Sequence, residues 1–285
     1  MKIVIALCLV FFMSQRTFSQ TTTAISAIHE KPFVLGFVDQ IHSKELDENR
    51  ILNIYLPPGY KKNDTLHYPV VYLLDGSADE DFIHITGLYQ FDSFSWVNRV
   101  PESIIVGIAN IDRRRDFTFP TMIKEDQEKY PTTGHSDKFM AFIEKELQPY
   151  IETNYKTNTS KTLIGESLGG LLAAEILLKK PTLFNKYIIV SPSIWWDNGS
   201  ILNEDSEVLK ESFSQQTQVY IGVGKEGLTG TKIPHVMEVD ANLLAEKIKN
   251  TKSKSVKVYF DYLPDEDHAT IMHQAVYNAL KMSVN

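Results

Sequence analysis

The architecture of this chain follows from one stretch, Lys161-Thr162-Leu163-Ile164-Gly165-Glu166-Ser167-Leu168-Gly169-Gly170-Leu171-Leu172-Ala173-Ala174. A short apolar strand runs into Gly165-x-Ser167-x-Gly169, and an alanine- and leucine-rich helical pattern follows at once. A turn between strand and helix of this kind is so sharp that Cβ atoms at its glycines would collide with neighbouring backbone. The sequence therefore predicts a strained, exposed serine at position 167.

A serine in that position has the setting of a nucleophile. The helix after it directs its first N–H groups, beginning with that of Leu168, toward the reacting centre, where they can hold an oxyanion. Such a serine needs an acid and a histidine, which follow it along the chain in that order. If these partners were missing, the motif would be a glycine-rich turn with an incidental serine.

Strand and helix patterns alternate around this stretch. Strands are expected at residues 33–38, 50–56, 68–74, 103–108, 187–190, 218–224 and 256–263, and helices at residues 137–153, 168–180, 239–250 and 271–282. The first two strands read as a hairpin, and from residue 70 onward strands alternate with helices. This order predicts an α/β fold with a mostly parallel central sheet and helices on both faces.

The predicted base is His268, which follows the last strand and so reaches the same sheet edge as Ser167. An imidazole suits the role because its charge changes near neutral pH. His273 is the alternative, but it falls inside a helical pattern. For the acid we favour Glu226, two residues past Gly224 at the end of the preceding strand.

Two other carboxylates follow at the start of the next helix, Glu238 and Asp240. The helix dipole already accounts for acidic residues there. Asp240 is kept as the alternative acid.

Two further loops are expected at the carboxyl edge of the sheet. The loop after strand 68–74 would give a second oxyanion N–H near Gly76 and Ser77, although the same residues could form a plain Asp-Gly turn. Trp195 and Trp196 follow strand 187–190 and would be costly to leave in water, so they either line a substrate pocket or cover the core.

A basic turn follows strand 103–108 and contains Arg113 and Arg115. Ligands of open α/β sheets bind at this end of the strands. Arginines in that position could hold an anionic or catecholic part of a substrate. Alternatively, ion pairs with Asp112 and Asp116 would give both arginines a structural role.

The amino terminus has the pattern of a secretory signal peptide. Lys2 precedes an apolar run from Ile3 to Met13, and a small-residue site follows near residues 17–19. We expect a signal peptide at residues 1–20, a lead-in at 21–32, and a single domain at 33–285. The protein would then be exported to the periplasm or secreted, without stable membrane insertion. The only cysteine, Cys8, would be lost with the signal peptide.

The composition limits the partners. The formal net charge of −7 argues against a nucleic-acid surface, and nothing in the sequence indicates the oligomeric state. A small-molecule substrate is therefore the expected partner.

From Arg50 to Leu280 the chain resembles the Putative esterase family of α/β-hydrolases, in particular the branch related to siderophore (enterobactin and bacillibactin) trilactone esterases. The resemblance rests on several stretches: Tyr68 to Gly76, Gly107 to Asn110, Arg113-x-Arg115-Asp116, Gly165 to Gly170, Ser191-Pro192-Ser193-Ile194-Trp195-Trp196 and Glu266-Asp267-His268.

This resemblance implies an α/β-hydrolase fold and a serine, acid and histidine hydrolase of carboxylic esters that needs no metal or organic cofactor. Siderophore-type esters are the expected substrates. The alternatives are an esterase of feruloyl or acetyl side chains on polysaccharides, and a non-catalytic protein that uses the fold to bind a ligand. Residues 227–234 match no pattern of the family, which bears on the choice of the acid.

Overall fold

The computed structural model describes residues 31–63 and 65–282. Contacts divide the chain into two units, Met1–Val34 and Leu35–Asn285, and the described helices and strands all lie in the second. The predicted signal peptide, residues 1–20, falls outside the described residues, as does the predicted lead-in apart from residues 31 and 32.

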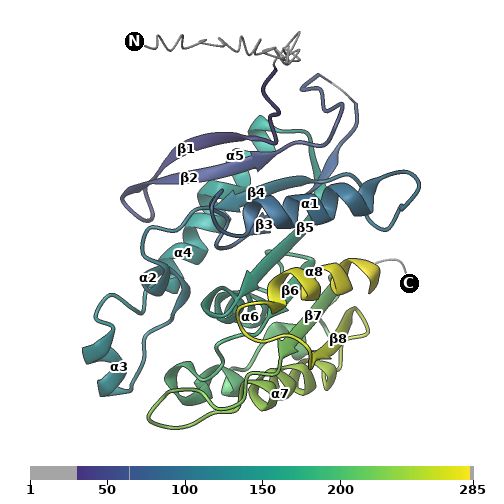
Figure 1. Cartoon of the computed structure of the whole chain (residues 1–285). Helices are drawn as coiled ribbons and strands as arrows, with labels where there is room; N and C mark the ends of the chain where they lie inside the picture. Colours follow the sequence, from purple (N-terminus) through teal and green to yellow (C-terminus); the bar gives the residue numbers. More distant parts are fainter. Residues whose placement is uncertain (1–30, 64, 283–285) are drawn as a thin grey trace, which may run out of the picture. The chain divides into compact units, whose positions relative to one another are not determined.

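The second unit is built on one sheet with the strand order β1-β2-β4-β3-β5-β6-β7-β8 (Figure 1). β1 and β2 are antiparallel, β2 pairs antiparallel with β4, and all later pairs are parallel. The strands are β1 (Phe37–Ser43), β2 (Glu48–Tyr55), β3 (Tyr68–Leu73), β4 (Ile104–Ile108), β5 (Thr157–Glu166), β6 (Lys186–Val190), β7 (Thr217–Gly224) and β8 (Val256–Leu263). The predicted mostly parallel sheet is confirmed.

Helices cover both faces of this sheet. They are α1 (Phe82–Ser93), α2 (Arg113–Phe117), α3 (Lys124–Lys129), α4 (Ser136–Phe142), α5 (Gln148–Asn154), α6 (Leu168–Lys179), α7 (Met237–Lys249) and α8 (Ile271–Met282), with 3₁₀ turns at Trp196–Asn203 and Glu207–Leu209. Side chains of α1 and α8 pack into one apolar cluster, and those of α4, α6 and α7 pack into another on the opposite face.

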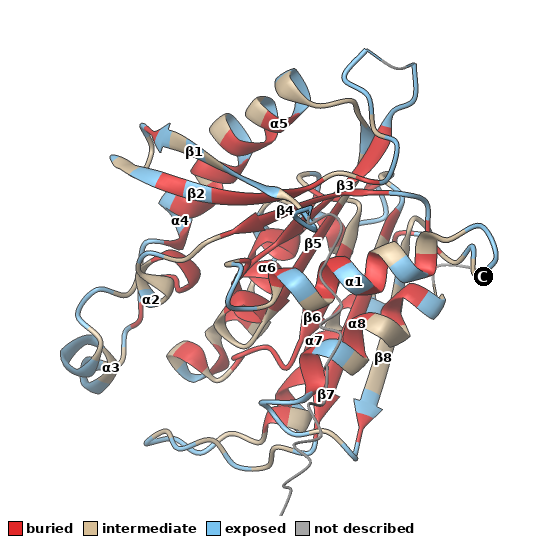
Figure 2. Cartoon of the chain, turned by 45° about the horizontal axis from the view of Figure 1, so that its top comes forward, coloured by how far each residue is buried: buried red, intermediate tan, exposed pale blue. Residues whose placement is uncertain are grey.

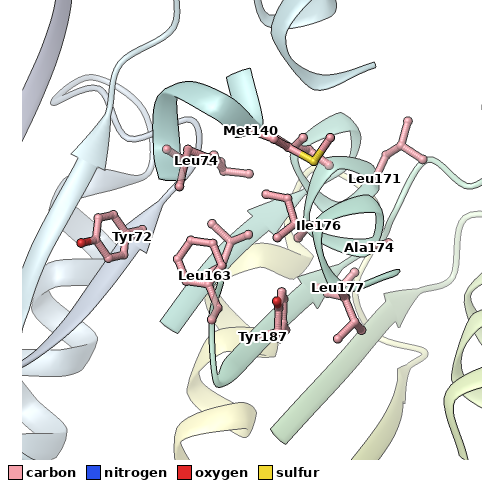
Figure 3. Close-up of a cluster of buried hydrophobic side chains, with 14 of the residues drawn as sticks. Tyr72, Leu74, Met140, Leu163, Leu171, Ala174, Ile176, Leu177 and Tyr187 are labelled. Atoms are coloured by element: carbon pink, nitrogen blue, oxygen red, sulfur yellow. The ribbon is translucent and has the colours of Figure 1, made fainter. Parts of the chain in front are cut away.

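The strands between these clusters are buried on both sides, as Figure 2 shows. Tyr72, Leu163 and Tyr187 of three neighbouring strands belong to the same buried apolar cluster as Leu171 and Leu177 of α6 (Figure 3). This explains why their sequences are continuous apolar runs rather than alternating ones. Burial on both faces holds the carboxyl end of β5 in place.

Two of the differences from the predicted elements have a clear physical cause. The first strand begins at Phe37 rather than at residue 33 and continues to Ser43, because polar Asp39 has partners in the folded chain: the hydroxyls of Tyr150 and Tyr155 donate to its carboxylate at 3.0 and 2.6 Å. The predicted helix 137–153 is interrupted by a π-helical turn, Ile143–Leu147. Pro149, two residues past the end of this turn, lacks the N–H that a regular helix would use.

Candidate active site

Ser167 lies in the sharp turn between β5 and α6. Its backbone has φ of 59°, a conformation that costs energy for a residue with a side chain. Its N–H donates to the carbonyl of Val190 on β6 at 3.0 Å, which fixes the turn to the sheet. A Cβ atom at Gly165 would lie 2.4 Å from the carbonyl oxygen of Gly169, so this position requires glycine, as expected from the sequence.

The structure brings together the three residues that the sequence singled out. His268 Nε2 lies 3.0 Å from Ser167 Oγ, and His268 Nδ1 lies 2.5 Å from Glu226 Oε2. They come from the carboxyl ends of β5, β7 and β8, which meet at one edge because these strands are parallel. The imidazole is about half exposed, whereas the side chain of Glu226 is 5% exposed. The arrangement can move a proton from the serine to the histidine.

The charges of Glu226 and His268 stabilise each other. The hydrogen bond with Glu226 raises the pKa of His268 above its ordinary value, and this outweighs the opposing effect of burial. Burial would raise the pKa of Glu226, but hydrogen bonds from His268 and Ser191 outweigh it and lower that pKa. Glu226 therefore stays a carboxylate and favours an imidazolium next to it.

Two residues that the sequence analysis did not identify hold Glu226 in place. The hydroxyl of Ser191, which follows β6, donates to Glu226 Oε1. The carboxylate of Glu238, at the start of α7, accepts hydrogen bonds from the backbone N–H groups of Glu226 at 2.9 Å and Gly227 at 3.0 Å. Glu238 was assigned only to the helix dipole, and no sequence pattern reveals a contact with a loop eleven residues earlier.

The alternative partners lie elsewhere. Asp240 is buried and bonds to Nδ1 of His235 at 2.9 Å, whose other ring nitrogen lies 3.1 Å from Asn198 Oδ1. His273 lies on α8 beside His84. Neither is hydrogen-bonded to Ser167, Glu226 or His268 in the described part of the chain.

The predicted oxyanion donors differ in whether their N–H groups already have an acceptor within the protein. Leu168 is the first residue of α6, so its N–H has no carbonyl within the helix. Ser77 precedes α1, and its N–H has no hydrogen-bond acceptor within residues 31–63 and 65–282. The N–H of Gly76, in contrast, donates to the carbonyl of Ile108 at 3.0 Å. The expectation for Gly76 is therefore corrected, because its donor is already used within the protein.

Arg113 and Arg115, which are predicted to bind substrate, both have partners within the protein. Arg113 forms two hydrogen bonds with the carboxylate of Asp75, at 2.6 and 3.0 Å, and donates to the carbonyl of Glu166 at 3.0 Å. Arg115 pairs with Asp116 at 2.8 Å and with Glu48 at 2.6 and 3.0 Å. Both guanidinium groups have internal carboxylate partners, and neither lines the pocket beside Ser167.

Trp195 and Trp196 have different roles. Trp196 is 1% exposed, packs in the core and donates from Nε1 to the carbonyl of Phe119 at 2.8 Å, so the prediction that it binds substrate is wrong. Trp195 is half-buried and lines a pocket of about 600 Å³ beside Ser167. Tyr130 and the exposed Lys225 also line this pocket, as does the unmatched segment 228–231.

Glu166 precedes the serine and was not identified as a site residue. One of its carboxylate oxygens is buried without a hydrogen-bond partner in the described residues. Burial, with the nearby carboxylates of Asp81 and Asp75, raises the pKa of Glu166 to about 7, although His268 and Arg113 act in the opposite direction. The charge beside the serine thus changes near neutral pH.

Residues 31–63 and 65–282 contain neither a cluster of three or more metal ligands nor a membrane-spanning helix. No three histidine, cysteine, aspartate or glutamate side chains in these ranges converge on a metal-sized position. No helix there combines the length and the apolar character that crossing a bilayer requires.

The chain is similar to known esterases. The model of the family described as "Putative esterase" matches residues 43–270. The ferri-bacillibactin esterase BesA of Bacillus subtilis (strain 168) is 27% identical over 287 residues, which cover 93% of this chain and 96% of that protein. The family resemblance inferred from the sequence is confirmed.

Solved structures show the same fold. An IroE-like serine hydrolase from Shewanella oneidensis is 32% identical, with a TM-score of 0.74 over 87% of this chain and 79% of that chain. The BES protein from Bacillus cereus is 28% identical, with a TM-score of 0.73 over 91% and 99% of the two chains. The predicted α/β-hydrolase fold is confirmed.

Proposed function

The chain belongs to the Putative esterase family of carboxylic ester hydrolases, and we propose that it cleaves its substrates through an acyl-enzyme on Ser167. The observation that supports this most is the continuous hydrogen-bonded chain from Ser167 Oγ through His268 to Glu226. A serine hydroxyl is a weak nucleophile unless an adjacent base removes its proton, and an oriented imidazole is such a base.

The reaction proceeds in two steps. His268 Nε2 accepts the hydroxyl proton as Ser167 Oγ adds to the ester carbonyl, and the N–H groups of Leu168 and Ser77 hold the oxyanion. The carbonyl re-forms, the bond to the alcohol breaks, and His268 returns its proton to the leaving oxygen. Water then attacks the acyl-enzyme with the same proton transfers and releases the carboxylic acid. Glu226 stabilises the imidazolium in both steps.

We propose siderophore-type esters as the substrates. The support is the relative named ferri-bacillibactin esterase, which aligns with nearly the whole chain. Trp195, Tyr130 and Lys225 beside Ser167 would suit an aromatic, anionic substrate. We also propose export, on the basis of the signal-peptide pattern in residues 1–20.

The test is an ester-hydrolysis assay on three substrates in parallel: a short-chain p-nitrophenyl ester, the ferric complex of a catecholate trilactone, and methyl ferulate. We expect turnover of the trilactone far above the others, and loss of all activity in Ser167→Ala by at least about 10³-fold. Unchanged hydrolysis by Ser167→Ala would refute the mechanism. Preference for methyl ferulate would instead favour a polysaccharide side-chain esterase.

A further inference from the structure

A pair of histidines lies outside the proposed active site, between the two helices that cover one face of the sheet. His84 is in the first turn of α1 and His273 is in the first turn of α8. Their Nδ1 atoms lie 3.3 Å apart, and the ring centroids lie 5.4 Å apart. The side chain of His84 is 34% exposed and His273 is exposed, so solvent reaches both rings.

The hydrogen bond made by Nε2 of His84 determines which ring nitrogen carries the proton. Nε2 lies 2.9 Å from Asp81 Oδ1, and a carboxylate at that distance accepts the N–H of the ring. The lone pair of His84 is therefore on Nδ1, directed at His273. The Nδ1 atom of His273 faces this nitrogen at 3.3 Å. Two imidazole nitrogens that face each other at this distance can bind one metal ion together.

We propose that His84 and His273 bind a divalent transition metal ion through their two Nδ1 atoms, with Zn²⁺ as the preferred ion. Two nitrogens that each lie about 2.0–2.1 Å from a tetrahedral ion are about 3.3–3.4 Å apart, which is the spacing found here. Imidazole suits Zn²⁺, Cu²⁺ and Ni²⁺. Asp81 completes the carboxylate, histidine and metal arrangement that fixes a ligand ring in its binding orientation.

The site would be a structural one. The protein supplies two ligands, and water fills the other positions. In the metal-free protein the 3.3 Å contact places a proton on Nδ1 of His273. When the ion binds, this proton is exchanged with solvent for one on Nε2, and the Nδ1 lone pair of His273 binds the metal. The ion would join the helix that follows the Ser77 loop to the helix that follows His268. It would thereby stabilise both loops of the proposed active site without contacting substrate.

Calorimetric titration of the metal-stripped protein with Zn²⁺ tests the proposal directly. We expect one site with a dissociation constant in the micromolar range, at least tenfold weaker binding in His84→Gln and in His273→Gln, and unchanged binding in His268→Gln. Saturating Zn²⁺ should raise the melting temperature of the wild type by about 5 °C and that of the two variants by much less. Circular dichroism verifies that the variants are folded.

Other outcomes would overturn the proposal. Absence of Zn²⁺ binding by the wild type up to millimolar concentration would do so, as would undiminished binding in both histidine variants. Loss of binding only in His268→Gln would assign the ion to the proposed active site instead.

Discussion

Glu226 and His268 show how burial and hydrogen bonding together determine the charge of neighbouring residues. The carboxylate is almost fully buried, yet hydrogen bonds from His268 and Ser191 keep its pKa low. Two opposite charges attract each other more strongly in a buried site than they do in water. The pair is therefore suited to forming and losing an imidazolium during a reaction.

Replacement of Glu226 by glutamine should alter both the rate and its pH dependence. In the wild type, kcat/KM should fall as the pH drops through the pKa of His268, which lies above the ordinary value of 6.5, because only the neutral imidazole accepts a proton. Glu226→Gln lacks the carboxylate that raises the pKa of His268, so the midpoint of the pH-rate profile should move to lower pH. The maximal kcat should fall by about 10²–10⁴-fold. A pH-rate profile with an unchanged midpoint would contradict the role given to Glu226.

Glu166 allows a prediction of stability rather than activity. Its pKa is raised to about 7 in the folded protein from 4.5, so between these values the folded state binds more protons than the unfolded state. Unfolding free energy should therefore decrease as the pH rises from 4.5 to 7, and the loss should persist above 7. In Glu166→Gln this loss should be absent, with a gain on the order of 1–3 kcal/mol at pH 8. Urea denaturation at pH 5 and pH 8 measures the difference, and an equal effect at both pH values would count against it.

Some residue roles could be predicted from the sequence and others could not. Ser167 and His268 follow strand patterns whose ends are clear, so the shared edge was predictable. Trp195 and Trp196 are adjacent, and only the turn after β6 decides that one lines the pocket and the other enters the core. The partner of Arg113 is Asp75, which is 38 residues earlier in the chain. Local sequence carries no signal for such a contact.

At the scale of elements, the connection between β7 and α7 supports the proposed active site. Met237 N–H donates to the carbonyl of Gly227 at 3.0 Å, and Glu238 binds two N–H groups of the same loop. The first turn of α7 thus holds the backbone that carries Glu226.

Glu238→Gln should weaken this hold, because a neutral amide is a poorer acceptor than a carboxylate. We expect kcat to fall by about tenfold with little change in KM, since substrate does not contact Glu238. Glu246→Gln is a matched control, because Glu246 lies on the same helix and forms only an exposed pair with Lys249. Equal effects in the two variants would show that the contact has no particular role.

A buried ion cluster joins β2 to α2. Arg50 and Asp116 are both fully buried and lie 2.8 Å apart, and the Arg50 guanidinium also donates to the carbonyl of Ala109 at 3.0 Å. Asp116→Asn would leave the buried Arg50 with the Glu48 carboxylate, 2.8 Å away, as its remaining carboxylate partner in the described ranges. Breaking a buried ion pair typically costs about 3 kcal/mol or more of unfolding free energy. Chemical denaturation should detect this loss, and no measurable change is expected for Glu207→Gln, whose pair with Lys210 is exposed. Similar stability of the two variants would contradict the argument.

Element boundaries were predictable where apolar runs are continuous and less so elsewhere. The last strand and the last helix were predicted with the boundaries that the structure has, 256–263 and 271–282. The first strand was misplaced because its inward residues include Asp39, whose tyrosine partners are more than 100 residues away. Edge strands depend on such distant contacts more than central ones do.

At the scale of the whole molecule, the protein and the proposed anionic substrate both carry negative charge. The chain carries a formal net charge of −7, yet the pocket beside Ser167 contains Lys225, for which no carboxylate partner is found in the described ranges. An anionic siderophore complex would be repelled by the overall charge and attracted by this lysine at short range. Screening of exposed charges acts over about 8–10 Å, so inside the pocket the substrate is affected mainly by Lys225 and by the carboxylates of Glu226 and Asp267. An anionic group of the substrate would therefore bind at the lysine.

Lys225→Ala should therefore distinguish anionic from neutral substrates. We expect kcat/KM for a ferric catecholate trilactone to fall by about threefold to tenfold, mainly through KM, because one favourable charge is lost. Hydrolysis of a neutral p-nitrophenyl ester should change by less than about twofold. Lys257→Ala, an exposed lysine on β8 outside this pocket, is the matched control. Since a general disturbance of the site would slow both substrates alike, only a selective loss on the anionic ester supports Lys225 as a determinant of specificity.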